Sequence, residues 1–334
     1  MSCTNRSIGH KDGAMRKESI LTVGSILCLW LLLFCLPAAE AAVAEYLKES
    51  ISPVLVINQF NNQLPLGQPV DVYVDGPGNL YVVDSSSRAV LIFDNHYQPV
   101  SRLDMGNGLQ SPNAVAVGQK GHIYVADAEQ GILVFNSIGK IIKKIDLNKL
   151  AEGRVRCAQD MVIDHQTDCL YLATGTEQGV LVIDPEGKLR AAITPKESRK
   201  EGMPPTPVAV NRVTLDSRGR IYCVSEEMGR IYVYENPETF LFQFGQKGGS
   251  FGKLSRPVGI AADCAQELIF VIDYMRHTLS MYNLNGVFLQ EYGGQGEKVG
   301  WFSHPDHICL DRENRLIVAD SFNHRLQVLA IHSP

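Results

Sequence analysis

The chain has 334 residues, of which 45% are apolar and 20% are charged, so it can bury a large core and is not a disordered polymer. It carries 31 basic against 36 acidic residues, a formal net charge of −5, which argues against broad electrostatic binding to phosphate backbones. Nucleic acid is therefore not an expected partner. The 29 Gly, 16 Pro, 12 Tyr and 12 Phe favour a β-rich protein with many turns.

The N-terminal segment has the pattern of an export signal. Arg16 and Lys17 precede an apolar run over residues 20–36, and the alanine-rich residues 38–42 follow it. This order is typical of a signal peptide, which we assign to residues 1–41. The run is also just long enough, at about 17 residues, to serve as an uncleaved membrane anchor. Both alternatives predict that the remainder is periplasmic or extracellular, with membrane contact through residues 20–36 if the signal is retained.

Five cysteines follow the predicted signal: Cys157, Cys169, Cys223, Cys264 and Cys309. No CxxC motif occurs among them, so neither a haem attachment site nor a thioredoxin-like redox motif is indicated. Cys223 and Cys309 lie in apolar strand patterns and are expected to be buried. A disulfide between Cys157 and Cys169 is one possibility that the sequence leaves open.

Six similar segments follow one another, at residues 69–94, 112–136, 158–184, 211–235, 257–283 and 305–330. The residue after the second apolar strand of each segment aligns, and we call it the anchor: Asp84, Asp127, Thr174, Ser225, Asp273 and Asp320. Each segment contains three short alternating strands with turns between them. A fourth strand is predicted after each of the first five, at residues 99–103, 140–145, 188–193, 240–244 and 287–292.

A repeat of about 40 to 50 residues with four antiparallel strands is typical of a propeller blade, which needs neighbours to bury both faces. The sequence therefore predicts an all-β, six-bladed β-propeller. The sixth segment lacks a fourth strand, whereas the apolar residues 54–60 stand alone and end in Gln59-Phe60, like Gln243-Phe244. We expect residues 54–60 to complete the last blade and to hide a strand edge. The domain would then span 54–334, after a linker at 42–53.

The repeats resemble those of NHL-repeat propellers. Residues 257–263 (PVGIAAD), residues 121–127 (GHIYVAD) and the segment from Pro305 to Leu329 carry the resemblance. It is weaker where Thr174 or Ser225 replaces the anchor Asp. The resemblance implies a propeller, here of an exported bacterial type, but it implies no particular function, because this fold serves many.

In such a propeller, the loops between second and third strands and the blade connections lie on one face, which is the expected binding surface. The charged candidates there are Arg88, Glu129, Glu177, Glu227, Arg230 and Arg276 in the loops, and Lys196, Arg199 and Lys200 in the longest connection. A basic connection would suit an acidic partner. The leading hypothesis is a non-catalytic scaffold that binds another protein in an envelope or extracellular complex, with no cofactor.

The alternative hypothesis is a metal-dependent lyase or hydrolase. His277, His304, His307 and His324 map to or near the same face, over the central channel, and imidazole is a common ligand of zinc, copper and nickel. The simpler interpretation is structural, because His304-Pro305 resembles the ordinary start of a repeat. A sugar or polymer receptor using Tyr274 and Phe322 ranks third. No GxSxG, HExxH or phosphate-loop motif occurs, so an enzyme is less favoured. The anchor carboxylates are expected to accept hydrogen bonds from backbone amides.

Overall fold

The structure is a computed structural model that describes residues 50–198 and 202–332. The expected signal at residues 1–41, most of the expected linker, and Arg199 and Lys200 lie outside these ranges. No helix within them is both long and apolar enough to cross a membrane. The described residues belong to one unit of chain contacts, Ser50–Pro334.

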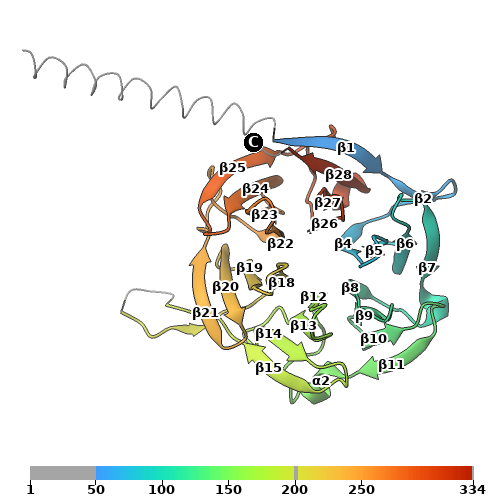
Figure 1. Ribbon diagram of the computed structural model, residues 1–334, viewed down its shortest axis with the longest axis horizontal. Coiled ribbons are helices and arrows are strands. Elements are labelled where there is room, and N and C mark those ends of the chain that lie inside the picture. The colour runs from blue at the N-terminus through green and yellow to red at the C-terminus, as the bar shows by residue number, and fades with distance from the viewer. Residues whose placement is uncertain (1–49, 199–201, 333–334) are drawn as a thin grey trace, which may run out of the picture. The chain divides into compact units, whose positions relative to one another are not determined.

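Six four-stranded antiparallel sheets are arranged in a ring, which confirms the predicted fold (Figure 1). The innermost strands are β4 (Pro69–Val74), β8 (Pro112–Val117), β12 (Asp160–Ile163), β18 (Arg212–Leu215), β22 (Pro257–Asp263) and β26 (His307–Leu310). The second strands are β5 (Leu80–Asp84), β9 (Ile123–Asp127), β13 (Leu170–Ala173), β19 (Ile221–Ser225), β23 (Leu268–Asp273) and β27 (Leu316–Asp320).

The third strands are β6 (Ala89–Phe93), β10 (Gly131–Phe135), β14 (Val180–Ile183), β20 (Arg230–Asn236), β24 (Thr278–Asn283) and β28 (Arg325–Ile331). The outermost strands are β7 (Pro99–Leu103), β11 (Ile141–Ile145), β15 (Leu189–Ile193), β21 (Thr239–Phe244), β25 (Phe288–Gly293) and β1 (Ile51–Ile57). Second strands such as β5 and β9 are buried along their whole length, whereas β7 is buried only at Leu103. The fully buried strands therefore lie inside each blade and the largely exposed ones at the rim.

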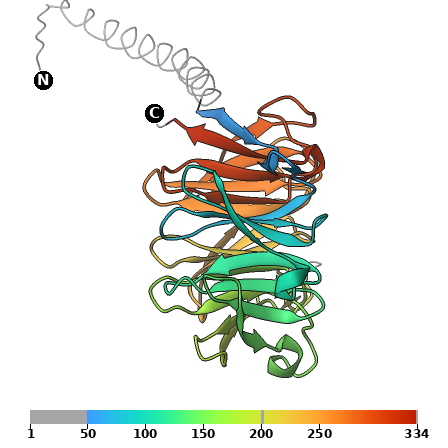
Figure 2. The ribbon, with the colours of Figure 1, turned by 90° about the vertical axis from the view of Figure 1, so that its right-hand side faces the viewer.

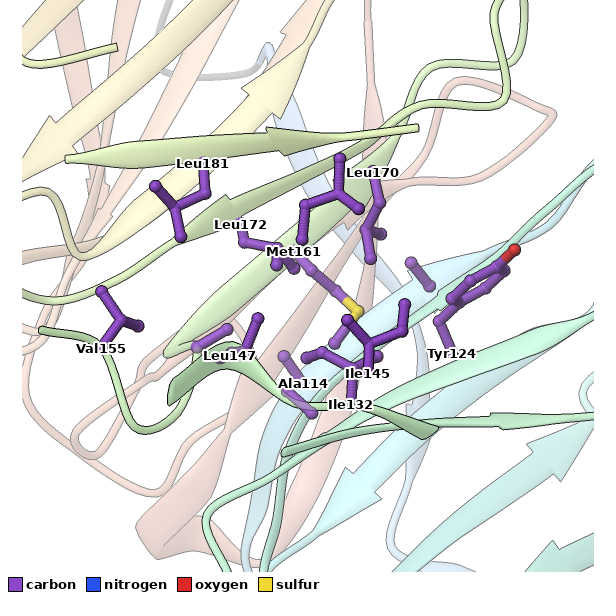
Figure 3. Packing of buried hydrophobic residues seen from close by; sticks show 14 of the residues in the cluster. Ala114, Tyr124, Ile132, Ile145, Leu147, Val155, Met161, Leu170, Leu172 and Leu181 are labelled. Atoms are coloured by element: carbon purple, nitrogen blue, oxygen red, sulfur yellow. The ribbon is translucent and has the colours of Figure 1, made fainter. Parts of the chain in front are cut away.

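The core lies between neighbouring blades. Between the second and third blades, Ile132 and Ala114 pack with Met161, Leu172 and Leu181, all of them at most 3% exposed (Figure 3). The other blade interfaces hold similar clusters of Val, Leu, Ile and aromatic side chains. Each blade therefore depends on its neighbours to cover its faces, as expected for this architecture.

The two ends of the described chain close the ring. Strand β1 pairs antiparallel with β28 from Ile51 opposite Ile331 to Ile57 opposite Leu326, and Figures 1 and 2 show the two strands side by side. Closure is as predicted, but the strand begins at Ile51 and ends at Ile57. Residues 51–53, expected in the linker, thus belong to the sheet.

The alignment of Gln59-Phe60 with Gln243-Phe244 placed the end of the closing strand three residues too late. Phe244 pairs with Ile231 at the end of its blade, and the residue in the equivalent place is Ile57. Phe60 instead lies in β2 (Gln59–Asn61), which pairs with β3 (Leu64–Pro65). Its ring packs edge-on against Phe93 of the first blade, with centroids 5.2 Å apart. Phe60 therefore fills a gap between blades and does not end the closing strand.

Short elements lie in the blade connections: η1 (Met105–Asn107), α2 (Leu147–Leu150) and the hairpin of β16 (Lys196–Glu197) and β17 (Thr206–Pro207). A further short element, η2 (Ser321–Asn323), lies in the loop between β27 and β28. Helix α2 begins where the Asp146 carboxylate accepts a hydrogen bond from the Lys149 amide, an N-cap. All five cysteines in the described ranges are free thiols, so the structure does not support a Cys157–Cys169 disulfide. Cys223 is buried as expected, whereas Cys309 is only partly buried.

Candidate functional site

The two sides of the ring differ in the connections they carry. We call the loop face the side with residues 85–88, 128–130, 174–179, 226–229, 274–277 and 321–324, which join second to third strands, and with the blade connections. We call the turn face the opposite side, where residues 75–79, 118–122, 164–169, 216–220, 264–267 and 311–315 join first to second strands. Arg88, Glu129, Glu177, Glu227 and Lys196 are exposed in the loops or connections of the loop face.

Two of the predicted binding residues are largely used inside the protein. Arg276 forms a two-point ion pair with Glu291 of β25 and donates to the Lys253 carbonyl at 2.7 Å; the Arg276 and Glu291 side chains are 11% and 9% exposed. Arg230 pairs with Glu197 at 2.5 Å, and Tyr232 also donates to that carboxylate. These contacts tie loops to the blades, so neither arginine is free to bind a partner.

The anchor residues hold the loop face together. Asp127 is fully buried and accepts hydrogen bonds from the amides of Gln110 and Ser111 in the preceding connection, and of Glu129 and Gln130 in its own loop, at 2.7–3.1 Å. Asp84 and Asp273 make corresponding bonds, whereas Asp320 accepts the Ser303 amide of the preceding connection and the side chains of Asn323 and Arg325. The expected bonds to backbone amides of the same loop are therefore confirmed for Asp84, Asp127 and Asp273 but not for Asp320, and all four carboxylates also bind the connection that enters the same blade.

The four predicted histidines do not form one cluster. His277 and His324 each stand four residues after an anchor with φ of 56° and 53°, the place that Gly229 fills in the fourth blade, so both end tight turns. Nδ1 of His277 accepts the His304 amide at 2.9 Å, and Nδ1 of His324 contacts the Gly67 carbonyl. Burial and the neighbouring His304 ring lower the pKa of His277.

Aromatic rings gather around His304 on the loop face. Its ring centroid lies 4.8 Å from that of Tyr274 and 4.6 Å from that of Phe322. The guanidinium of Arg256 stands 4.7 Å from the Tyr274 centroid and pairs with Glu226 at 2.7 Å. Phe322 is 45% exposed and the adjacent Met275 55%. We call Tyr274, Met275, His304, Phe322 and Arg256 the aromatic patch.

His307 is not part of the aromatic patch. It occupies one of six equivalent positions on the innermost strands, one in each blade. Each of these positions is on the first strand of a blade, and it pairs across the sheet with the second-strand residue that directly precedes the anchor. The residues at this position are Asp71, Ala114, Asp160, Arg212, Gly259 and His307. The NHL-like pattern has glycine here, as in Gly259. Four of the six blades carry an ionisable side chain instead, at a level where buried charge is costly unless it is paired.

Three of these side chains meet across the central channel. Nδ1 of His307 lies 3.0 Å from Asp71 Oδ1, and Nε2 lies 3.6 Å from Asp160 Oδ1. Each carboxylate is oriented by the next blade, because Asp71 Oδ2 accepts the Val115 amide at 2.7 Å and Asp160 Oδ2 the Val213 amide at 2.8 Å. Asp71, Asp160 and His307 each offer one ligand atom, and these three atoms lie within 4.8 Å of one another, close enough to hold one metal ion. Among the described residues, this is the group of three or more His, Cys, Asp or Glu residues that meets this distance.

Electrostatics at this level reflect burial and crowded charge. Burial opposes a charged imidazole, but the carboxylates of Asp71 and Asp160 outweigh it and raise the pKa of His307. Burial raises the pKa of Asp160, and His307 only partly offsets it. Arg212 donates to the Val258 carbonyl at 2.6 Å and lies 3.8 Å from Asp306 Oδ1; its positive charge lowers the pKa of both Asp160 and His307.

A cavity of about 310 Å³ lies against this group. Asp160 and His307 belong to its lining, the apolar side chains of Val213 and Ile260 form walls, and residues 164–166 and 217 of the turn face lie at its rim. The cavity thus extends toward the turn face and not toward the predicted binding surface. Asp71, Asp160 and Arg212 were missed by the sequence analysis, although the aligned repeats show them where Gly259 stands.

Comparisons with known proteins agree with this architecture. A family model for the NHL repeat matches residues 302–329, most of the last blade before its closing strand. NHL repeat-containing protein 2 of Gallus gallus is 30% identical over 105 residues, which cover 28% of this chain and only 14% of that relative. The match therefore spans a small part of the curated relative.

Solved structures share the fold at low identity. An auxiliary nutrient binding protein from Bacteroides thetaiotaomicron is 13% identical with a TM-score of 0.61, over 84% of this chain and 78% of that one. Virginiamycin B lyase from Staphylococcus aureus is 12% identical with a TM-score of 0.56, over 84% of this chain and 99% of that one. The fold and these matches define a six-bladed β-propeller. Within this propeller, the match to the NHL repeat lies in the last blade.

Proposed function

We propose that this chain is a non-catalytic, exported NHL-repeat propeller that binds another protein through its loop face. The observation that carries the proposal is the aromatic patch, where Phe322 and Met275 are about half exposed on a surface fixed by ring contacts. Aromatic, Met and Arg side chains are enriched where proteins bind one another. A patch that is already ordered loses little side-chain entropy on binding.

The patch stands on loops that the blades hold rigidly. Tyr274 and Met275 directly follow the anchor Asp273, which accepts the Met275 amide at 3.1 Å. Phe322 follows the anchor Asp320, and its amide donates to the Ser303 carbonyl at 3.1 Å. Two neighbouring blades thus present one apolar surface, and a scaffold of this kind suits recognition by its loops.

The partner that fits is a protein with an apolar anchor flanked by acidic groups. Arg256 is 48% exposed at its side chain and lies beside Tyr274, so it can receive a carboxylate from a partner as well as from Glu226. The exposed Lys196 in the longest connection is a further cation on this face. Export through residues 1–41 would place the complex in the periplasm or outside the cell, with membrane contact limited to that segment if it is retained.

The test is site-specific photo-crosslinking in the native host. A photoreactive amino acid replaces Met275 on the loop face or, as the control, Ile138 on the turn face, which is 82% exposed. We expect a discrete crosslinked protein from position 275 and none from position 138. Phe322→Ala in the same chain should abolish the crosslink, because Phe322 supplies the exposed ring of the patch.

The fold of each variant is checked by its melting temperature, which exposed substitutions should leave nearly unchanged. Equal crosslinking from both positions, or a crosslink from position 275 that survives Phe322→Ala and Arg256→Ala together, would show that the loop face is not the binding surface.

A further inference from the structure

We propose that Asp71, Asp160 and His307 bind a divalent transition-metal cation in the central channel, with Zn²⁺ the best match to the ligand set. The site is separate from the aromatic patch and does not depend on the proposed partner. It also differs from the predicted histidine cluster, of which it uses one member. The inference concerns cation binding itself and rests on three features of the channel.

The first feature is the orientation of the ligand atoms. The carboxylates of Asp71 and Asp160 are 5% and 3% exposed and each is held by a backbone amide of the next blade, which leaves Oδ1 turned toward His307. Outer contacts of this kind are what fix the ligands of metal sites. Oδ1 of Asp160 also accepts the Met161 amide at 2.8 Å and keeps a further lone pair.

The second feature is a buried nitrogen without a hydrogen bond. Nδ1 of His307 stands 3.0 Å from Asp71 Oδ1, yet the two atoms do not meet the geometry of a hydrogen bond, and Nδ1 has no other partner. The nitrogen atom itself is buried, although the ring borders the 310 Å³ cavity. The three ligand atoms lie within 4.8 Å of one another, close enough for one ion to bind all three.

The third feature is charge. Three carboxylates, those of Asp71, Asp160 and Asp306, lie with one imidazole and the Arg212 guanidinium, which is 3.8 Å from Asp306 Oδ1 and also affects the pKa of Asp160 and His307. Even a charged His307 leaves one negative charge without a partner. A divalent cation beside a neutral imidazole brings the sum to zero, and buried charge is stable when it is matched in this way or coordinates a metal.

The ligand types select the cation. Imidazole favours zinc, copper, iron and nickel, whereas carboxylates alone favour magnesium, calcium and manganese. Zn²⁺ accepts both imidazole nitrogen and carboxylate oxygen, and three protein ligands leave a fourth position open. Here the 310 Å³ cavity, which Asp160 and His307 line, lies beside the ligands.

The experiment uses the full chain without a histidine tag, stripped with chelator and titrated with ZnCl₂ by calorimetry. MnCl₂ and MgCl₂ are the comparison salts. We expect one Zn²⁺ per chain, weaker Mn²⁺ and no Mg²⁺ at the same concentrations. Asp71→Asn, Asp160→Asn and His307→Gln should each weaken Zn²⁺ binding about 100-fold or more. Asp164→Asn at the cavity rim and His96→Gln on the exposed turn face are matched controls and should change it less than twofold.

A second measurement keeps the proposal testable if a channel variant fails to fold. Zn²⁺ at 100 times its dissociation constant should stabilise the unaltered chain by about 2.7 kcal/mol, seen as a higher melting temperature. The proposal is overturned if no Zn²⁺ binds at micromolar concentration. It is equally overturned if folded Asp160→Asn and His307→Gln proteins bind as well as the unaltered chain, or if His96→Gln removes the bound ion, because the site then lies on the surface.

Discussion

Ile57 stands opposite Leu326, so that the first strand of the described propeller completes the sheet begun by its last repeat. The pair joins segments from the two ends of the domain, and β1 contributes the outer strand that the sixth repeat lacks. Ile57 is 8% exposed and belongs to the cluster between the last and first blades. The last blade therefore depends on residues that are far in sequence from the rest of that blade.

We predict that Ile57→Ala lowers the free energy of unfolding by about 3 kcal/mol, because it removes buried methyl groups at the closure. Urea denaturation measures the loss. Val54→Ala in the same strand is the control, since Val54 is 51% exposed, and it should change stability by less than about 0.5 kcal/mol. A loss for Ile57→Ala as small as that for Val54→Ala would mean that β1 adds little to the core.

A second prediction concerns the anchors. Asp127→Ala takes the buried acceptor away from four partly buried amides of two segments and should cost about 3 kcal/mol. Thr174 holds the equivalent place with a hydroxyl that donates to the Gly179 carbonyl at 2.9 Å and accepts the Thr176 amide at 3.2 Å. Thr174→Ala should therefore cost about 1 kcal/mol. Thermal unfolding ranks the two variants, and the reverse order would contradict the role given to the carboxylate.

The third prediction separates structural from binding arginines on the loop face. Arg276→Ala leaves Glu291 without its ion-pair partner at 9% exposure, so it should destabilise the fold by about 3 kcal/mol. Arg88 is exposed, and Arg88→Ala should leave the melting temperature within about 1 °C. If Arg276→Ala leaves the stability unchanged, the ion pair with Glu291 is not structural, and Arg276 is again a candidate for binding a partner.

The fold follows from periodicity that is local in sequence. Alternating apolar strands, turn residues and the anchor recur in every repeat, so the number of blades and the strand order could be predicted, and the outer strand at residues 99–103 was predicted to the residue. Closure could be predicted because one repeat lacked a strand. Its register could not, because Phe60 looks like Phe244 but packs on Phe93, a contact that sequence similarity does not report.

The candidate site depends on positions that are distant in sequence. His277, His304 and His324 share the loop face but point into turns and ring contacts, since side-chain direction depends on φ and on neighbouring blades. Asp71, Asp160 and His307 come from three different repeats and meet only when the ring closes. A comparison of each repeat with Gly259 would have identified them as departures from the pattern.

The last prediction follows from the pKa of Asp216 in the turn between the first two strands of the fourth blade. Burial alone would raise this pKa, but hydrogen bonds from the Arg220 amide and guanidinium and from the Tyr222 hydroxyl outweigh it and lower the pKa below its ordinary value of 3.8. A carboxyl whose pKa is lowered by folding adds stability above its unfolded pKa and loses it as the pH falls through the folded pKa. Asp216→Asn should therefore cost about 2 kcal/mol at pH 7.

The difference between the unaltered chain and Asp216→Asn should stay constant down to about pH 4 and shrink below it, as the native carboxyl becomes protonated. Urea denaturation from pH 7 to pH 2 measures both curves. Glu238→Gln serves as the control, because Glu238 is an exposed carboxyl in a turn and its removal should leave the acid slope unchanged. Parallel curves for Asp216→Asn and the unaltered chain across the acid range would show that the hydrogen bonds from Arg220 and Tyr222 do not favour the charged form.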